Sequence, residues 1–347
     1  QLTEDKHLSI WWKGSLIVDN IEVDFAPSAG RLVFGGRTGD AYQNQQIDEI
    51  VLTTIAADKA IFNVASADAV SVTAKIEDSG QSVVDTATVT MTVDGAAATP
   101  LTVTKDGAIT TVRWVSPTYL TAGQELNVAI ACQDTRAVAI SGSRTATVAP
   151  YATIPTAYKV PAATGAGFLL RPYQTEAAQP NTLMWTEEQL LGLHGANIAD
   201  LTGATGGIFT QTGVLNYNGD ATGDAGSFTD AGGFAEDIFP GFPGTTGNTG
   251  NSALEVMTYL EFPAADLYQF GVNSDDGFRV TAGRAPGDLL GTILGYYDGG
   301  KGASDVLFSV LVTEPGIYPI RLIWENGDGN LPDNGFNLEF FTVKDGV

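Results

Sequence analysis

Cysteine, histidine and basic residues are all scarce in this chain. Its 347 residues include one cysteine, two histidines and 17 Lys and Arg, against 40 Asp and Glu. With Cys132 alone, no internal disulfide can form, so cysteine content does not indicate the cellular compartment. The chain also lacks Cys/His metal spacings, a nucleophile elbow and a phosphate loop. We therefore predict that the protein is not an enzyme.

Positive charge and long apolar runs are missing as well. The formal net charge of −23 repels phosphate backbones and anionic head groups, so neither a nucleic acid nor a membrane surface is expected as a partner. No apolar run approaches the roughly 18 residues that span a bilayer. An apolar content of 44% still predicts well-packed cores, with Cys132 as a buried strand thiol. No leader sequence is apparent at Gln1, so a secreted protein would be present here in a mature or trimmed form.

Apolar and polar residues alternate with a period of two along almost the whole chain. This pattern, with Thr, Val and Ile in the runs and Gly and Asp at the turns, is typical of strands. It predicts an all-β fold of tandem β-sandwich domains. One short helix is predicted near 187–194, with Thr186 and Gln189 as a capping box and Gly195 as its end.

Residues 1–56 read as strands of an incomplete sheet. The strands are expected at Leu8–Trp12, Ser15–Val18, Arg31–Phe34 and Ile47–Leu52. The segments Phe34–Asp40 and Ile47–Thr54 resemble the closing strands of laminin-G or legume-lectin-like jelly rolls. That resemblance implies a partial jelly roll with open sheet edges. Either the missing part was removed, or another chain supplies the complement.

Three further regions follow along the chain. Residues 57–148 hold closely spaced strands with Asp-Gly turns, and they resemble a bacterial immunoglobulin-like spacer. Residues 149–165 carry three prolines among small residues and predict a stiff linker. Residues 166–347 form the last domain, with a Gly/Asn/Asp-rich stretch at 200–252. Aromatic residues recur along this stretch. They favour an ordered loop that covers a sandwich, rather than a disordered segment.

The strongest chemical signal is a pair of adjacent carboxylates, Asp275 and Asp276, at the end of an apolar strand. Adjacent aspartates repel each other unless a cation or a cluster of donors neutralises them. Hard oxygen ligands of this kind suit Ca²⁺. The alternative is an Asx-rich turn whose side chains bond to their own backbone without any metal.

The stretch around this pair, Tyr268–Val280, resembles a strand of the protective-antigen fourteen-kilodalton module, a carbohydrate-binding β-sandwich. Glu314–Glu325 and Asn337–Val343 resemble its long strand and closing strand, and Gly167–Thr175 resembles its first strand. The resemblance implies a cis peptide between the two aspartates, a bound Ca²⁺ and a second metal loop at 325–334. The loop residues that could donate oxygen are Asn326, Asp328, Asn330 and Asp333. This loop is longer than in the simplest lectin members of the family.

Three aromatic residues could stack on a sugar ring: Tyr296, Tyr297 and Trp324. Core or rim positions are the alternative for each of them.

These observations together predict a secreted, bacterial-type surface protein that binds surface glycans or polysaccharide, assisted by Ca²⁺, in adhesion. One alternative is a self-assembling subunit of a surface layer or filament, in which identical subunits complete the open N-terminal sheet by strand addition. Another is a non-catalytic accessory region of a polysaccharide-degrading enzyme.

Overall fold

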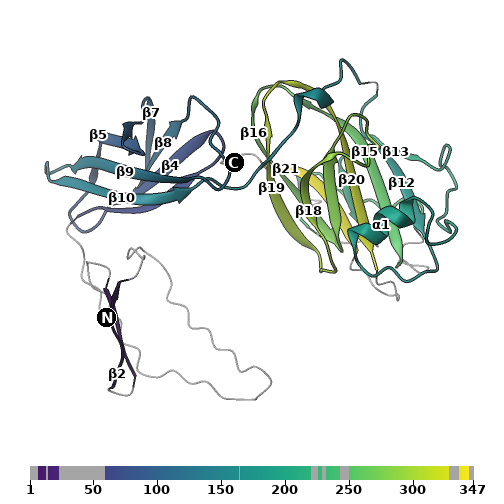
Figure 1. Ribbon diagram of the computed structural model, residues 1–347, viewed down its shortest axis with the longest axis horizontal. Helices are drawn as coiled ribbons and strands as arrows, with labels where there is room; N and C mark the ends of the chain where they lie inside the picture. The colour runs from purple at the N-terminus through teal and green to yellow at the C-terminus, as the bar shows by residue number, and fades with distance from the viewer. Residues whose placement is uncertain are drawn as a thin grey trace. The chain divides into compact units, whose positions relative to one another are not determined.

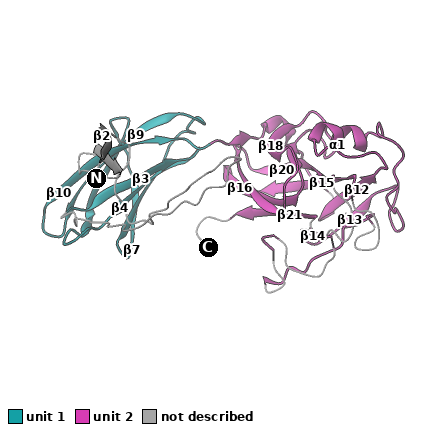
Figure 2. Ribbon diagram, turned by 90° about the horizontal axis from the view of Figure 1, so that it is seen from below, with its two compact units in different colours: residues 1–149 teal, residues 150–347 magenta. Residues whose placement is uncertain are grey.

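A computed structural model shows that the described part of the chain consists mainly of strands, which confirms the all-β fold (Figure 1). The structure describes residues 7–12, 15–22, 59–163, 165–219, 226–228, 232–242, 250–327 and 336–343. The chain divides at 149/150 into two compact units (Figure 2). Neither the one α-helix nor the 3-10 helix of the described part has the length and apolar character of a membrane-spanning helix.

Two antiparallel sheets of four strands each make up the described part of unit 1 beyond residue 58. In order across the sheet, the first consists of β10 (Ala139–Thr147), β9 (Glu125–Asp134), β5 (Val84–Val93) and β6 (Ala96–Ala97). The second consists of β3 (Ile61–Ala67), β4 (Ser71–Glu77), β8 (Ile109–Val115) and β7 (Leu101–Asp106). Strand β9 shows the expected alternation, and its Cys132 is buried, as predicted. Burial raises the pKa of the Cys132 thiol.

Two strands of the N-terminal region are described. They are β1 (His7–Trp12) and β2 (Ser15–Glu22), which pair antiparallel. The other two strands predicted there, at 31–34 and 47–52, lie outside the described residues.

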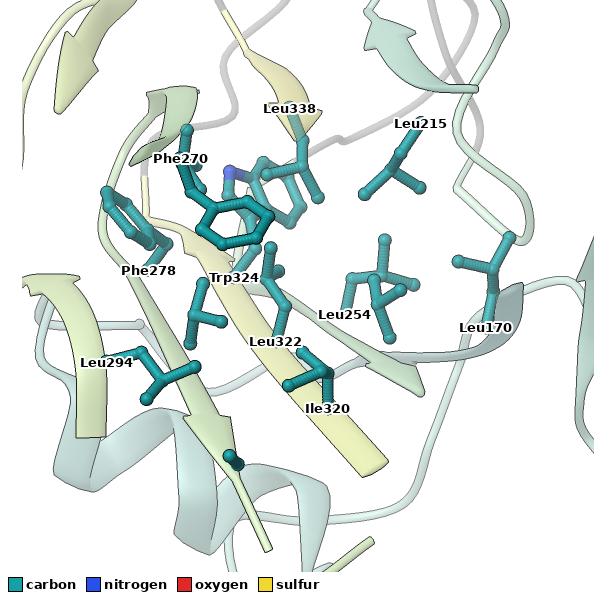
Figure 3. Packing of buried hydrophobic residues seen from close by; sticks show 14 of the residues in the cluster. Leu170, Leu215, Leu254, Phe270, Phe278, Leu294, Ile320, Leu322, Trp324 and Leu338 are labelled. Atoms are coloured by element: carbon teal, nitrogen blue, oxygen red, sulfur yellow. The ribbon is translucent and has the colours of Figure 1, made fainter. Parts of the chain in front are cut away.

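Unit 2 contains a five-stranded and a six-stranded sheet. In order, the five-stranded sheet consists of β11 (Ala152–Thr153), β19 (Ser304–Val312), β16 (Asp266–Asp275), β21 (Asn337–Val343) and β14 (Leu215–Asn218). The six-stranded sheet consists of β13 (Phe209–Gln211), β12 (Phe168–Gln174), β15 (Ser252–Phe262), β20 (Gly316–Asn326), β17 (Phe278–Ala282) and β18 (Thr292–Tyr297). Inward-facing residues of both sheets form one core around Trp324 (Figure 3).

The proline-containing segment predicted as a linker belongs to unit 2 from Pro150 onward. Strand β11 pairs in parallel with β19, and the Ile154 amide donates to the Leu311 carbonyl at 3.1 Å. Ile154 is buried in the core of unit 2. The apolar residue between the prolines anchors the segment to the sheet, a packing contact that composition alone does not reveal.

Helix α1 (Leu183–Leu190) begins four residues earlier than predicted. Thr182 is its N-cap, with an extended backbone and a hydroxyl that accepts from the Trp185 amide. Thr186 lies inside the helix instead, where its hydroxyl donates to the Thr182 carbonyl at 2.9 Å. The helix ends before Gly192, whose φ of +80° suits glycine. Figure 1 shows α1 lying across the six-stranded sheet.

Candidate metal centre

The two aspartates lie where the chain crosses from one sheet of unit 2 to the other. Strand β16 of the five-stranded sheet ends at Asp275, and β17 of the six-stranded sheet begins at Phe278. The peptide bond between Asp275 and Asp276 is cis, as the resemblance implies. The Trp324 indole N–H donates to the Asp275 carbonyl at 2.9 Å. The acidic pair is therefore fixed to both sheets.

Strand β20 brings a distant segment against the pair. Its residue Trp324 lies opposite Phe278 in the sheet register. The Asp276 amide donates to the Glu325 carbonyl at 3.0 Å, and the Glu325 amide donates to the Gly277 carbonyl at 3.0 Å. This pairing places the carboxylates of residues 276 and 325 at one site, although they are far apart in sequence.

The Asp276 side chain is nearly buried and accepts two main-chain hydrogen bonds. The Lys301 amide donates to its Oδ1 at 2.8 Å, and the Gly327 amide donates to its Oδ2 at 3.2 Å. These contacts orient the carboxylate without neutralising it. Asp275 is partly exposed and lies opposite Asn337 of β21.

Lys301 supplies positive charge beside the pair. Its ammonium donates to the main-chain carbonyls of Ser274 at 2.5 Å and Ser304 at 2.6 Å rather than to a carboxylate. Burial lowers the pKa of Lys301, although Asp275, Asp305 and Asp276 favour its charged form. The ammonium therefore compensates part of the negative charge without occupying the carboxylate oxygens.

Glu325 is a fully buried carboxylic acid beside Asp276. Its Oε1 accepts from the Gly277 amide at 3.3 Å, and its Oε2 has no hydrogen-bond partner. Burial, and then the neighbouring charge of Asp276, raise the pKa of Glu325 to about 8. A buried carboxyl group in this setting is stabilised by a proton or by a cation.

We expect the stability of unit 2, freed of metal ions, to fall as the pH rises from about 4.5 to 8. In this range the folded state keeps the Glu325 proton that the unfolded state releases, so each pH unit costs at most about 1.4 kcal/mol. Urea unfolding at pH 5, 6, 7 and 8 measures the effect. Glu325→Gln is the control and should flatten the profile. Equal slopes for the two proteins would contradict this assignment.

Asn181, just before α1, reaches the same site from another part of the chain. A Cβ placed on Gly327 would clash with its Oδ1, and one on Gly300 would lie 2.7 Å from its Nδ2. The Asn181 Oδ1 atom is buried without a hydrogen-bond partner. Asp298 also lies nearby, where its carboxylate accepts from the Leu183 amide at 2.8 Å. Sequence reasoning missed Asn181, Asp298 and the role of Glu325 because no local pattern marks them.

The residues predicted for the site are only partly brought together. Asn326 ends β20 and is buried beside Gly327. Tyr296 and Tyr297 are 58% and 37% exposed at the end of β18, next to β17. Three further predicted ligands lie outside the described residues: Asp328, Asn330 and Asp333.

The prediction that Trp324 stacks on a sugar is wrong. Its side chain is 0% exposed. Between the two sheets, the centroid of its ring lies 4.6 Å from that of the Phe239 ring. Alternation along β20 directs it into the core, opposite in direction to Glu325 and Ile323. An indole in this position has no open face for a ligand.

The donor set suits a hard cation better than a transition metal. In the described chain, no three His, Cys, Asp or Glu side chains form a metal-binding group. A cation here would therefore draw on amide and main-chain oxygens as well as carboxylates, as Ca²⁺ does. The partnerless, buried oxygens Glu325 Oε2 and Asn181 Oδ1 fit such an ion.

Comparisons with known proteins give structural similarity without a family assignment. No protein-family model matches the chain, and no curated protein matches it. The PA14 domain of the antifreeze protein MpAFP aligns over 54% of this chain and 86% of its own, with 16% identity and a TM-score of 0.34. The Epithelial Adhesin 9 A domain of Candida glabrata, in complex with Galb1-4GlcNAc, aligns over 56% and 87%, with 15% identity and a TM-score of 0.34. The Epithelial Adhesin 6 A domain of Candida glabrata, in complex with Galb1-3GlcNAc, aligns over 54% and 84%, with 15% identity and a TM-score of 0.31. These scores are too low to carry a functional argument.

Proposed function

We propose that unit 2 is a calcium-assisted carbohydrate-binding module and that the protein acts at the cell surface in adhesion, without catalysis. The observation that carries the proposal is the acidic pair. It lies at the junction of two sheets, with the Asp276 carboxylate held by two amides next to a buried carboxyl group that has a partnerless oxygen. The resemblance of Tyr268–Val280 to the protective-antigen module supports it from the sequence.

In this proposal Asp275, Asp276 and Asn326 hold the ion, and Asn181 and Glu325 lie against it. The bound Ca²⁺ would supply open coordination positions for sugar hydroxyl groups. All of these residues offer oxygen atoms, the ligands that Ca²⁺ prefers. The main-chain bonds to Asp276 keep its carboxylate aligned before the ion arrives, which lowers the cost of ordering the site.

The exposed rim beside the pair is the proposed sugar contact. The Tyr297 carbonyl oxygen approaches Gly277, and the Tyr297 hydroxyl donates to the Gly300 carbonyl at 3.4 Å. Tyr296, the more exposed of the two tyrosines, offers an aromatic face on which a sugar ring can stack.

Calcium titration by calorimetry tests the proposal. Asp276→Asn removes one charge but keeps an oxygen that accepts from Lys301, so the fold should survive. We expect its affinity for Ca²⁺ to fall at least by the roughly 10–100-fold that follows loss of an outer-shell partner. Glycan binding on an array should be lost in the same variant and in wild type treated with chelator.

Asp266→Asn is the matched control. Asp266 begins the same strand and is exposed. Among the described residues, its side chain accepts a hydrogen bond only from the Leu267 amide. It should bind Ca²⁺ and glycans like wild type. Absence of Ca²⁺ binding by the wild-type protein, or equal binding by the 276 variant, would refute the proposed function.

A further inference from the structure

The outer face of the five-stranded sheet carries two rows of oxygen-bearing side chains. In the register of the sheet, Asn216 of β14 lies opposite Glu339 of β21, which lies opposite Asn273 of β16, which lies opposite Asp305 of β19. The neighbouring row runs from Asn218 through Asn337 to Asp275. Directly opposite residues share a face and have Cβ atoms about 4.5–5.5 Å apart. We call Asn216, Asn218, Asn273, Asp305, Asn337 and Glu339 the outer polar face.

Most of this face is buried, although it is polar. Asn216 and Glu339 are 0% exposed, and Asn337 is 1% exposed. The next residues along these strands, such as Leu215 and Leu338, point the other way into the core. The outer polar face is thus a second buried layer, on the side of the sheet away from the core. Asp305, at its end, is exposed and leaves a route to solvent.

Residues of the Gly/Asn/Asp-rich region cover the face. The Ser227 and Phe228 amides donate to the two oxygens of Glu339 at 2.6 and 3.0 Å. The Asn216 amide group donates to the carbonyls of Phe234 and Ala235 at 3.1 and 3.2 Å. These contacts tie the described residues 227–228 and 234–235 to the outer polar face.

Two amide oxygens of this face have no donor. The Asn337 amide group donates to Asn273 Oδ1 at 2.7 Å, and the Asn273 amide group donates to Asp305 at 2.6 Å. The Oδ1 atoms of Asn216 and Asn337 remain buried with no hydrogen-bond partner. Each such atom costs roughly 1–3 kcal/mol if nothing meets it. Two amide oxygens without a donor, beside the buried Glu339 carboxylate, indicate that a cation binds between them.

The described residues also provide no salt-bridge partner for the charge of this face. Within the described chain, no Lys or Arg forms an ion pair with Glu339 or Asp305. Burial raises the pKa of Glu339, and the charges of Glu236 and Asp305 raise it further. The ammonium of Lys301 interacts electrostatically with Asp305, but its hydrogen bonds go to main-chain carbonyls instead.

We propose that the outer polar face binds a divalent cation, Ca²⁺ by its chemistry, through Glu339 and the free amide oxygens of Asn216 and Asn337. Oxygen-only donors that combine one carboxylate with amide oxygens suit Ca²⁺ and exclude the softer transition metals. This site adjoins the acidic-pair site, because Asn337 lies opposite Asp275, but it uses different carboxylates: that of Asp276 accepts from the Lys301 and Gly327 amides. It joins the covering residues to the sheet, so its role is to order them.

Hydrogen exchange of the full chain, in Ca²⁺ and after chelation, locates the ion without any variant. We expect Ca²⁺ to slow exchange at the Ser227 and Phe228 amides and in peptides spanning 216–218. Protection confined to 275–277 and 325–327, or none at all, would overturn the proposal.

Calcium stoichiometry in Asp276→Asn separates this proposal from the proposed function. We expect wild type to bind two Ca²⁺ and the 276 variant to keep one. Loss of all binding in that variant would refute the second site, whereas full retention would refute the acidic-pair site alone. Glu339→Gln, with its fold checked by circular dichroism, should keep only the Ca²⁺ of the acidic-pair site. It should also lose the protection from exchange at Ser227. If Glu339→Gln does not fold, the result for Asp276→Asn decides by itself.

Discussion

Replacing Arg321 by alanine is expected to destabilise unit 2 by about 3–5 kcal/mol, because it removes one partner of a buried ion pair. The Arg321 side chain is 3% exposed and lies between two carboxylates from different elements. Its Nη atoms donate to both oxygens of Glu187 on α1, at 2.5 and 2.7 Å, and its Nε donates to Glu255 on β15 at 2.5 Å. Loss of the guanidinium would leave both carboxylates without their main counter-charge.

Two further arginines extend this network over the outer face of the six-stranded sheet. Arg171 donates to Glu255 at 2.7 Å and to the Leu190 carbonyl at the end of α1, and Arg279 pairs with Glu187. Burial alone would raise the pKa of Glu255, but Arg321 and Arg171 hold it below its usual range. The network therefore orients α1, and with it Asn181, whose side chain lies beside Gly327.

Urea unfolding of the full chain, followed by a probe in unit 2, measures the effect of Arg321→Ala. Lys159→Met is the matched control, because Lys159 pairs with Glu314 at 3.8 Å with side chains 40% and 57% exposed. Such a surface pair contributes about 0–1 kcal/mol. Equal losses for the two variants would show that the buried network does not hold the helix.

Replacing Trp324 by alanine is expected to cost about 3–5 kcal/mol, as for other fully buried aromatic residues. Figure 3 shows the indole among Phe270, Phe278, Leu322 and Leu338 in the core of unit 2. Several side chains pack there from strands of both sheets. Removing the ring would leave a cavity that these strands cannot close, because they are held in place by their ladders.

The same substitution should also weaken Ca²⁺ binding, because the indole N–H holds the Asp275 carbonyl at the end of β16. Trp324→Phe keeps most of the ring but loses this bond, so it should lose Ca²⁺ affinity with a smaller loss of stability. Trp114→Ala is the control, since Trp114 is half-buried in unit 1. Denaturant titration and calorimetry measure both effects. Unchanged Ca²⁺ affinity in both 324 variants would show that the indole does not position the acidic pair.

Parts of the candidate site could be predicted from local sequence. The acidic pair stands out because two adjacent carboxylates end an apolar strand, and its cis peptide agrees with the family resemblance. The sequence predicts the start of the helix four residues too late, because Thr182 and Thr186 both precede plausible helical turns. Only the fold shows which hydroxyl caps the helix and which lies within it.

Alternation with period two is a property of the backbone, since successive strand side chains point to opposite faces. For this reason the residue order alone predicts the strands, the all-β class and the burial of Cys132. It does not reveal which strands become neighbours or what covers each face. Those contacts arise only on folding, when β20 brings Glu325 to Asp276 and the Ser227 and Phe228 amides bond to Glu339. The composition therefore predicts an acidic sandwich, while long-range pairing decides which carboxylate and amide oxygens come together.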